Sequence, residues 1–289
     1  MTLEINHLNK YRKNLVTNIV LFIGKDSKIK DFANILDKNV NYNFLEGLKK
    51  KDEFIKQSIT SLDLTLNKKI VFIWIGKKLE FQEIEKLGAK FFDYLNKNKI
   101  NDVTIYGPSL QKLNQNFELE YFLHGIQLKS YNFNIYKSKK KNNQFKIKVF
   151  QNNKKNISNK TRLKLGALLK GTNFARDLVS EPGNILHPDE YAKRLLKLKK
   201  IGLKVTVYDE KKLKKLGCNA LLGVGQGSVR GSYLVTIEWK GNKSKSKPLA
   251  FVGKGVCFDT GGISLKPARF MEDMTYDMAG SAVVVGLMK

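Results

Sequence analysis

The sequence predicts an α/β protein with two domains. Short apolar runs at Val16–Ile23, Ile70–Ile75 and Val103–Tyr106 each end next to a glycine, which is typical of buried parallel strands. Patterns with helical periodicity lie between these runs. This alternation favours a parallel or mixed sheet with helices on its faces. A length of 289 residues, 42% of them hydrophobic, is enough for about two domains with cores of their own.

The first domain is predicted to span residues 1–150 and to be an α/β sheet with flanking helices. Its clearest helix is Phe81–Leu95, where apolar residues recur on one stripe. A second helix is predicted around Tyr121–Ile126. The alternating segment Phe145–Phe150 is predicted to be an edge strand within a lysine- and asparagine-rich linker region, residues 137–160. This half of the chain shows no catalytic constellation.

The second domain is predicted to span residues 151–289. A Pro-Gly turn signal after Glu181 ends its first helix, and acidic residues after Pro188 begin the next one. The predicted elements, in order, are a helix from near Ser158 to Ser180, a helix from Asp189 to Leu198, a strand at Val205–Tyr208, a helix at Asp209–Leu216, and strands at Tyr233–Trp239 and Leu249–Phe258.

The formal net charge of +27 raises the question of a polyanionic partner. Lysine supplies most of the positive charge, and the lysines are scattered beside asparagines through both predicted domains. Bidentate recognition of phosphate or bases would favour arginine. Compositional drift on solvated faces is therefore the preferred interpretation, and nucleic-acid binding is the alternative.

Cysteine and histidine usage argues against several other classes of site. Cys218 and Cys257 are the only cysteines, and no basic-then-apolar leader precedes the first domain, so a reducing, cytoplasmic location without a membrane span is expected. The three histidines, His7, His124 and His187, match no zinc spacing and are interpreted as structural or surface residues.

The stretch from Val252 to Met278 carries the chemistry. Lys254 lies inside an apolar run, where a buried ammonium needs a partner or must lose its proton, and a neutral amine is a fair ligand for a divalent cation. Asp259 follows five residues later, before a Gly-Gly turn. Residues five apart on a straight strand face opposite sides, so the two side chains share a site only if the strand ends or bends.

More charged residues follow downstream. Lys266 precedes a proline, which favours an extended backbone and suits a side chain held over a site. Asp273 and Asp277 would share one face of a helix, and spacing alone does not choose between them.

These residues resemble the metal-binding core of the leucyl (cytosol) aminopeptidases, a two-metal family. The similarity rests on GKGVCFDTGGISLKP at residues 253–267 and MEDMTYDMAGSA at residues 271–282, with two further matches upstream at residues 173–184 and 220–228. The order and number of these motifs make the resemblance specific over about residues 160–289. For residues 1–150 it implies a macro-like regulatory or oligomer-shaping domain.

The resemblance implies a role for each matching residue. Lys254, Asp259 and Asp277 correspond to metal ligands, with Asp259 bridging two divalent cations, Mn²⁺ or Zn²⁺. Lys266 corresponds to the catalytic lysine that polarises the substrate carbonyl, and Met274 to a methionine of the substrate pocket. The implied activity is removal of leucine-like N-terminal residues from peptides by metal-activated water, in a homo-hexamer when the protein is full-length.

The remaining ligands of the family, in an Asn-Thr-Asp-Ala-Glu-Gly-Arg motif, are expected beyond position 289. The chain is therefore interpreted as a truncated aminopeptidase with an α/β/α catalytic domain and a mixed sheet. The alternatives are a catalytically incomplete fragment and a nucleic-acid-binding or regulatory protein. Metal analysis distinguishes the first from an enzyme, and a steep salt dependence of binding identifies the second.

Overall fold

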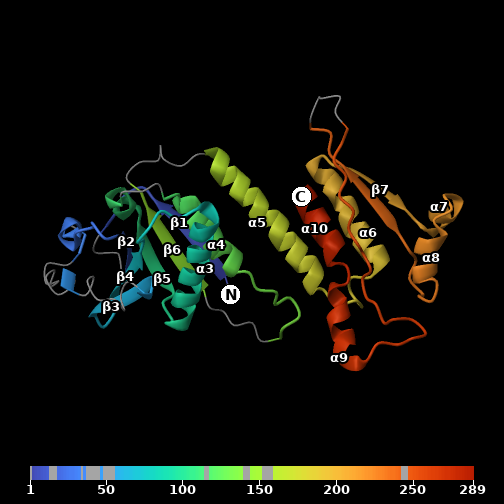
Figure 1. The fold of residues 1–289 in the computed structure, drawn as a ribbon, viewed down its shortest axis with the longest axis horizontal. Coiled ribbons are helices and arrows are strands. Elements are labelled where there is room, and N and C mark those ends of the chain that lie inside the picture. The colour runs from blue at the N-terminus through green and yellow to red at the C-terminus, as the bar shows by residue number, and fades with distance from the viewer. Residues whose placement is uncertain are drawn as a thin grey trace. The chain divides into compact units, whose positions relative to one another are not determined.

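The protein was analysed as a computed structural model, which describes residues 2–12, 18–33, 35–36, 46–47, 56–113, 117–138, 144–151, 159–241 and 247–289. The chain divides into two compact units, Met1–Leu165 and Gly166–Lys289. Figure 1 shows the helices and strands of both. Domain boundaries at 150 and 151 stay a prediction.

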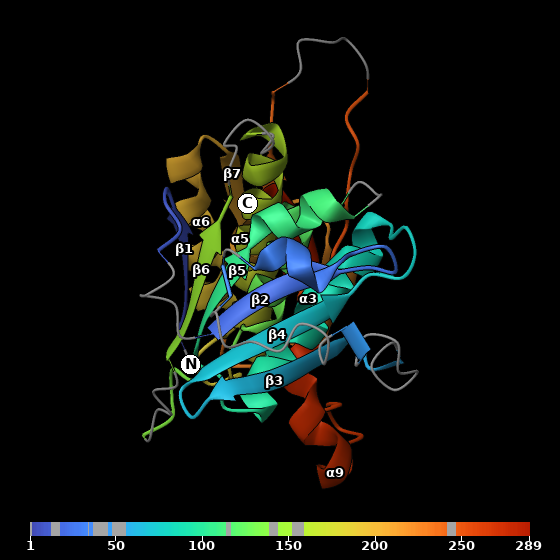
Figure 2. The same cartoon turned by 90° about the vertical axis from the view of Figure 1, so that its left-hand side faces the viewer.

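The first unit is built on a six-stranded mixed sheet, which agrees with the predicted α/β class. The strand order is β1-β6-β5-β2-β4-β3, and Figure 2 shows the strands following one another across the sheet. Only β3 runs antiparallel to its neighbour. The elements of this unit are β1 (Thr2–Leu8), β2 (Asn18–Ile23), η2 (Ile29–Phe32), β3 (Ile59–Thr65), β4 (Lys68–Trp74), α3 (Phe81–Lys97), β5 (Asp102–Tyr106), η3 (Gly107–Lys112), α4 (Leu119–Lys129) and β6 (Gln144–Phe150).

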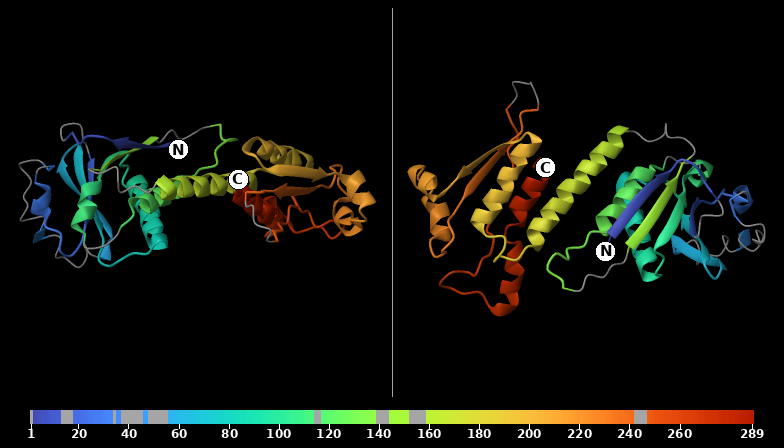
Figure 3. Two further views of the ribbon diagram at one scale, coloured as in Figure 1. Left: turned by 90° about the horizontal axis from the view of Figure 1, so that it is seen from above. Right: turned by 180° about the vertical axis from the view of Figure 1, so that it is seen from behind.

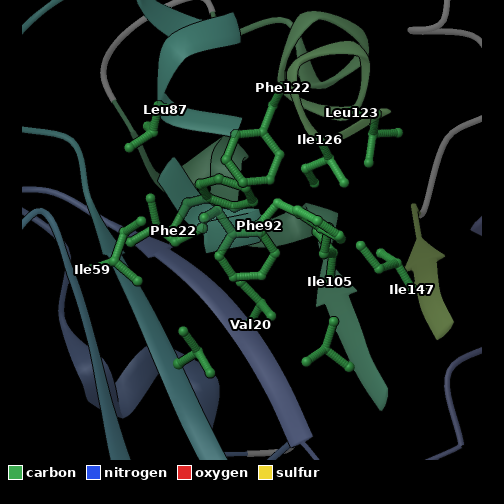
Figure 4. Close-up of a cluster of buried hydrophobic side chains, with 14 of the residues drawn as sticks. Val20, Phe22, Ile59, Leu87, Phe92, Ile105, Phe122, Leu123, Ile126 and Ile147 are labelled. Carbon is green, nitrogen blue, oxygen red and sulfur yellow. The ribbon is translucent and has the colours of Figure 1, made fainter. Parts of the chain in front are cut away.

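The three apolar runs of the first domain form β2, β4 and β5, as predicted, although residues 16 and 17 lie outside the described residues. Strand β2 is buried on both faces because its side chains alternate between two cores. Val20 and Phe22 contribute to the core beneath α3 and α4, and Leu21 to the core on the opposite face. Figure 4 shows the first of these cores, where the rings of Phe22 and Phe122 meet edge to face with centroids 5.3 Å apart.

The prediction that Phe145–Phe150 is an edge strand is wrong. Strand β6 lies between β1 and β5, with Phe145 paired to Leu3 in parallel register. Its alternating pattern arises because only one face is fully covered, and the N-terminal strand, which the sequence pattern did not reveal, occupies the edge. The rest of the predicted linker lies largely outside the described residues.

The second unit combines a helical layer with a small antiparallel sheet. Strands β7 (Lys204–Tyr208) and β8 (Leu234–Glu238) pair with each other, and no further strand joins them among the described residues. Figure 3 shows this pair with the helices of the unit. Those helices are α5 (Asn159–Ser180, which begins in the first unit), α6 (Pro188–Leu196), η5 (Lys197–Ile201), α7 (Glu210–Lys215), α8 (Asn219–Gly225), α9 (Ala268–Met271), η6 (Glu272–Tyr276) and α10 (Ala279–Met288).

The predicted strand Leu249–Phe258 does not form. The described residues offer no neighbouring strand to this segment, and its backbone makes no strand hydrogen bonds. Leu249 is 87% and Val252 97% exposed, so the apolar run lies on the surface of the second unit instead of in a sheet interior. The helices and strands predicted between 158 and 239 do form, within a few residues of the predicted ends.

Helix α5 crosses α10 at a pair of glycines. A Cβ on Gly171 would lie 2.3 Å from the carbonyl oxygen of Gly286, and a Cβ on Gly286 would lie 2.6 Å from that of Gly171. Both distances are below van der Waals contact, so only glycine allows the two backbones to approach this closely. Among the described residues, no helix in either unit is long and apolar enough to cross a membrane.

Candidate metal centre

The N-terminus of α10 holds the segment that carries Lys254. A Cβ on Gly253 would lie 2.5 Å from Cα of Ser281, so the absence of a side chain at this position lets the segment reach the helix backbone. The N–H group of Ser281 then donates a hydrogen bond of 2.8 Å to the carbonyl oxygen of Lys254. The first N–H groups of a helix have no partner within the helix, so this contact satisfies a free donor and fixes Lys254 at the same time.

Lys254 forms an ion pair with Asp277, and Nζ lies 2.7 Å from Oδ1. Asp277 directly follows η6 and is 16% exposed at its side chain, whereas Lys254 is 59% exposed. The expected burial of Lys254 is therefore wrong, because no strand covers the segment around it. The hydrogen bond from Lys254 to Asp277 raises the pKa of the lysine above its ordinary value, so the amine is an ammonium in the metal-free chain.

Asp259 forms the second ion pair, with Lys266, whose Nζ lies 2.7 Å from Oδ2. The other carboxylate oxygen accepts a hydrogen bond of 2.8 Å from the N–H of Gly261. The hydrogen bond from Lys266, followed by the one from Gly261, lowers the pKa of Asp259. Gly261 and Gly262 have φ values of +96° and +86°, so the predicted Gly-Gly turn uses conformations that favour glycine.

The two pairs belong to one site. Lys254 and Asp259 are close enough that each shifts the pKa of the other through their opposite charges. Residues 254–259 do not form a strand, so Lys254 and Asp259 are not forced onto opposite sides as they would be on a straight strand. The structure thus places the four charged residues to which the resemblance implies roles in two ion pairs, Lys254–Asp277 and Asp259–Lys266.

The choice between Asp273 and Asp277 has a structural explanation. Residues 272–276 form a 3₁₀ helix, η6, in which residues four apart do not share a face. Asp273 is exposed to solvent, while Asp277 points at Lys254. Met274 lies half-buried in η6, and its place in a substrate pocket stays a prediction.

The donor set suits a hard or borderline divalent cation. Asp277 and Lys254 lie in contact, and Oδ2 of Asp277 is buried without a hydrogen-bond partner among the described residues, which is unusual for a carboxylate oxygen. Within the same residues, no group of three or more His, Cys, Asp or Glu side chains is arranged to hold a metal.

Cys257, His187 and His124 have structural surroundings in their own units. Burial raises the pKa of the Cys257 thiol to about 12, which leaves it protonated and unreactive near neutral pH. His187 caps the N-terminus of α6 and contacts Asp189. His124 is buried in the first unit, where Nδ1 lies 2.7 Å from a carboxylate oxygen of Glu85.

Two residues of the site were not predicted from the sequence. The hydroxyl groups of Tyr191 and Ser281 lie 3.1 Å apart, and Ser281 also contacts the segment of Lys254 through its backbone. Ser281 lies four residues after Asp277, inside the motif at residues 271–282, so the sequence could have indicated that it belongs to the site. Tyr191 lies on α6, far away in sequence, and no local pattern connected it with the site.

The fold and the site define a class of protein: an α/β protein whose second unit carries clustered lysines and carboxylates at the N-terminus of a helix. The model of the cytosol aminopeptidase family N-terminal domain matches residues 20–140, and the model of that family's catalytic domain matches residues 173–289. The chain belongs to the cytosol aminopeptidase family.

Individual relatives agree with this assignment. A probable cytosol aminopeptidase of Brucella anthropi is 41% identical over 275 residues, which are 92% of this chain and 52% of the relative. A probable cytosol aminopeptidase of Phytoplasma australiense is 44% identical over 217 residues, which are 74% of this chain and 44% of the relative. The chain spans about half the length of the curated relatives that it matches.

Solved structures support the fold. The cytosol aminopeptidase from Coxiella burnetii has a TM-score of 0.68 and 21% identity, covering 97% of this chain and 56% of that one. The bottromycin maturation enzyme BotP, solved in complex with Mn, has a TM-score of 0.65 and 20% identity, covering 94% of this chain and 55% of that one. At these identities the likeness concerns the fold.

Proposed function

We propose that the chain carries part of the active site of a metal-dependent aminopeptidase that removes N-terminal, preferably leucine-like, residues from peptides. The observation that supports this function is a set of two lysine–carboxylate ion pairs within residues 254–277, one of them beside the N-terminus of α10 and with a buried carboxylate oxygen left without a partner among the described residues. Family membership supports the reaction class, and the two ion pairs support the choice of side chains proposed below.

In this proposal, Lys254, Asp259 and Asp277 hold divalent cations, two of them when the site is complete, with Mn²⁺ or Zn²⁺ as the candidates. When bound, such ions activate a water molecule and polarise the substrate carbonyl. The ion pair with Lys266 and the hydrogen bond from Gly261 keep Asp259 ionised and hold its carboxylate in one orientation. An ionised, fixed carboxylate is the form that binds a cation.

Lys266 is the proposed catalytic residue. Its ammonium group is held beside Asp259 by a backbone contact, 3.3 Å from Nζ to the carbonyl oxygen, as well as by the carboxylate. A cation fixed in this way stabilises negative charge that develops on the carbonyl oxygen of a substrate. Met274 is the proposed contact for the side chain of the N-terminal substrate residue. A hexameric assembly and a cytoplasmic location are part of the same proposal.

Replacement of Asp259 tests the proposal. We expect Asp259→Asn to weaken Mn²⁺ binding by at least about tenfold in calorimetric titration, because even outer-shell partners of a metal contribute about 10–100-fold. In the full-length protein, hydrolysis of leucine p-nitroanilide in the presence of Mn²⁺ is expected to fall in parallel. Asp273→Asn is the matched control, because it removes one nearby exposed carboxylate and should change neither measurement. Equal Mn²⁺ affinity in the two variants would exclude Asp259 as a ligand.

A further inference from the structure

We infer that Tyr191 is a positioning residue for the site, acting through Ser281 to fix the turn that presents Lys254 and Asp277. The inference rests on the proposed function for its catalytic meaning. Its structural basis is a chain of hydrogen bonds that joins α6 to the N-terminus of α10 and then to the backbone of Lys254.

The direction of each hydrogen bond follows from the available protons. The hydroxyl of Ser281 donates to the carbonyl oxygen of Met278 at 2.8 Å, which uses its one proton. The hydroxyl of Tyr191, 3.1 Å away, therefore donates to Oγ of Ser281. Burial raises the pKa of Tyr191 to about 12, so the phenol keeps the proton that this bond needs.

This series of hydrogen bonds reaches the backbone on both sides of the Lys254–Asp277 ion pair. Met278, whose carbonyl group accepts from Ser281, follows Asp277 directly and is completely buried. The N–H of Ser281 binds the carbonyl of Lys254. A shift of the Ser281 side chain would thus move the backbone beside Asp277 and the backbone of Lys254 together. The 2.7 Å distance between their charged groups depends on both positions.

Helix α6 gives Tyr191 a rigid base. The tyrosine is only 5% exposed and belongs to the core of the second unit. Arg194, one turn later, donates to Glu181 at 2.9 Å and to Glu190 at 3.0 Å, which ties α6 to the end of α5. A side chain fixed in this way is suited to orienting a neighbour that binds the backbone of a proposed metal ligand, which is the role that second-layer hydrogen bonds have at metal sites.

Hydrogen exchange of the metal-free chain tests the structural part of the inference. Tyr191→Phe keeps the buried ring and removes only the hydroxyl. We expect exchange of the Ser281 amide, the donor to Lys254, to accelerate by about tenfold or more, because the turn loses an anchor. The amide of Leu213 in α7, which donates to the carbonyl oxygen of Asp209, should keep its exchange rate. Equal acceleration at both amides, or none at Ser281, would overturn the inference.

Metal affinity tests the positioning itself. Tyr191→Phe is expected to weaken Mn²⁺ binding by about tenfold, the lower end of the range for outer-layer partners. Tyr208→Phe is the matched control, because the Tyr208 hydroxyl makes no hydrogen bond among the described residues. Unchanged Mn²⁺ affinity in Tyr191→Phe would overturn the inference. If the unmodified chain fails to bind Mn²⁺, the proposed function fails, and the exchange rate of Ser281 still decides whether Tyr191 fixes the turn.

Discussion

The affinity of the chain for Mn²⁺ is expected to rise about a hundredfold between roughly pH 6 and pH 8, because Lys254 must lose a proton to bind a cation. Asp277 raises the pKa of Lys254 above its ordinary value, so the amine is fully protonated throughout this range. Each bound ion that uses the amine then displaces one proton. Below the pKa, displacement of one proton changes the apparent affinity about tenfold per pH unit. Affinity therefore rises with pH.

A series of calorimetric titrations at constant ionic strength measures this dependence. Lys254→Met removes the amine, so its Mn²⁺ affinity should be lower at the upper pH and nearly flat across the range. Lys247→Met, at an exposed lysine away from the site, should keep the slope of the unmodified chain. If the unmodified chain binds Mn²⁺ with the same affinity at both ends of the range, Lys254 is not a ligand and Asp277 holds the ion without it.

The residues of the two ion pairs could be singled out because they lie close together in the sequence, and their metal-binding roles stay predictions. Lys254 and Asp277, the outermost of the four, are 23 residues apart, and both ion pairs form within that stretch. A Gly-Gly turn and a proline restrict the backbone between them. Local chain geometry, which a sequence motif encodes, therefore accounts for both ion pairs, while α6 and α10 contribute the hydrogen bonds that hold the segment of Lys254.

Features that depend on distant partners were not predictable in the same way. Tyr191 and Ser281 are 90 residues apart, and nothing around either of them indicates the other. The apolar pattern of Leu249–Phe258 indicates a strand, but a strand needs a hydrogen-bonding neighbour, and the described residues provide none. Strand β6 shows the opposite case. Its pattern suggested an edge strand, but the N-terminal strand β1 pairs with it and makes it an interior strand.

The same distinction separates the two kinds of glycine in the second unit. Gly261 and Gly262 were recognisable as turn residues because consecutive glycines favour left-handed conformations. Gly171 and Gly286 look like weak positions in helical patterns, and glycine inside a helix costs about 1 kcal/mol relative to alanine. Their purpose becomes visible only where α5 and α10 cross, since each backbone fills the space of the missing side chain on the other.

Gly171→Ala is expected to lower the free energy of unfolding of the second unit by about 1–2 kcal/mol. Overpacking of a close contact typically costs about 1–3 kcal/mol, and here the added Cβ would lie 2.3 Å from a backbone oxygen of α10. That oxygen belongs to a helix, so it moves only if the helix moves. The overlap should outweigh the gain of about 1 kcal/mol in helix propensity that alanine brings.

Gly166→Ala in the same helix is the matched control. A Cβ at Gly166 meets no atom within 4 Å, so only the propensity term applies, and stability should rise by about 0.5–1 kcal/mol. Urea unfolding followed by circular dichroism measures both variants. The two changes are chemically identical and are expected to have opposite signs, so equal stability of Gly171→Ala and Gly166→Ala would contradict the close crossing. Because α10 carries Ser281 and begins two residues after Asp277, displacement of the helix should also weaken Mn²⁺ binding in Gly171→Ala alone.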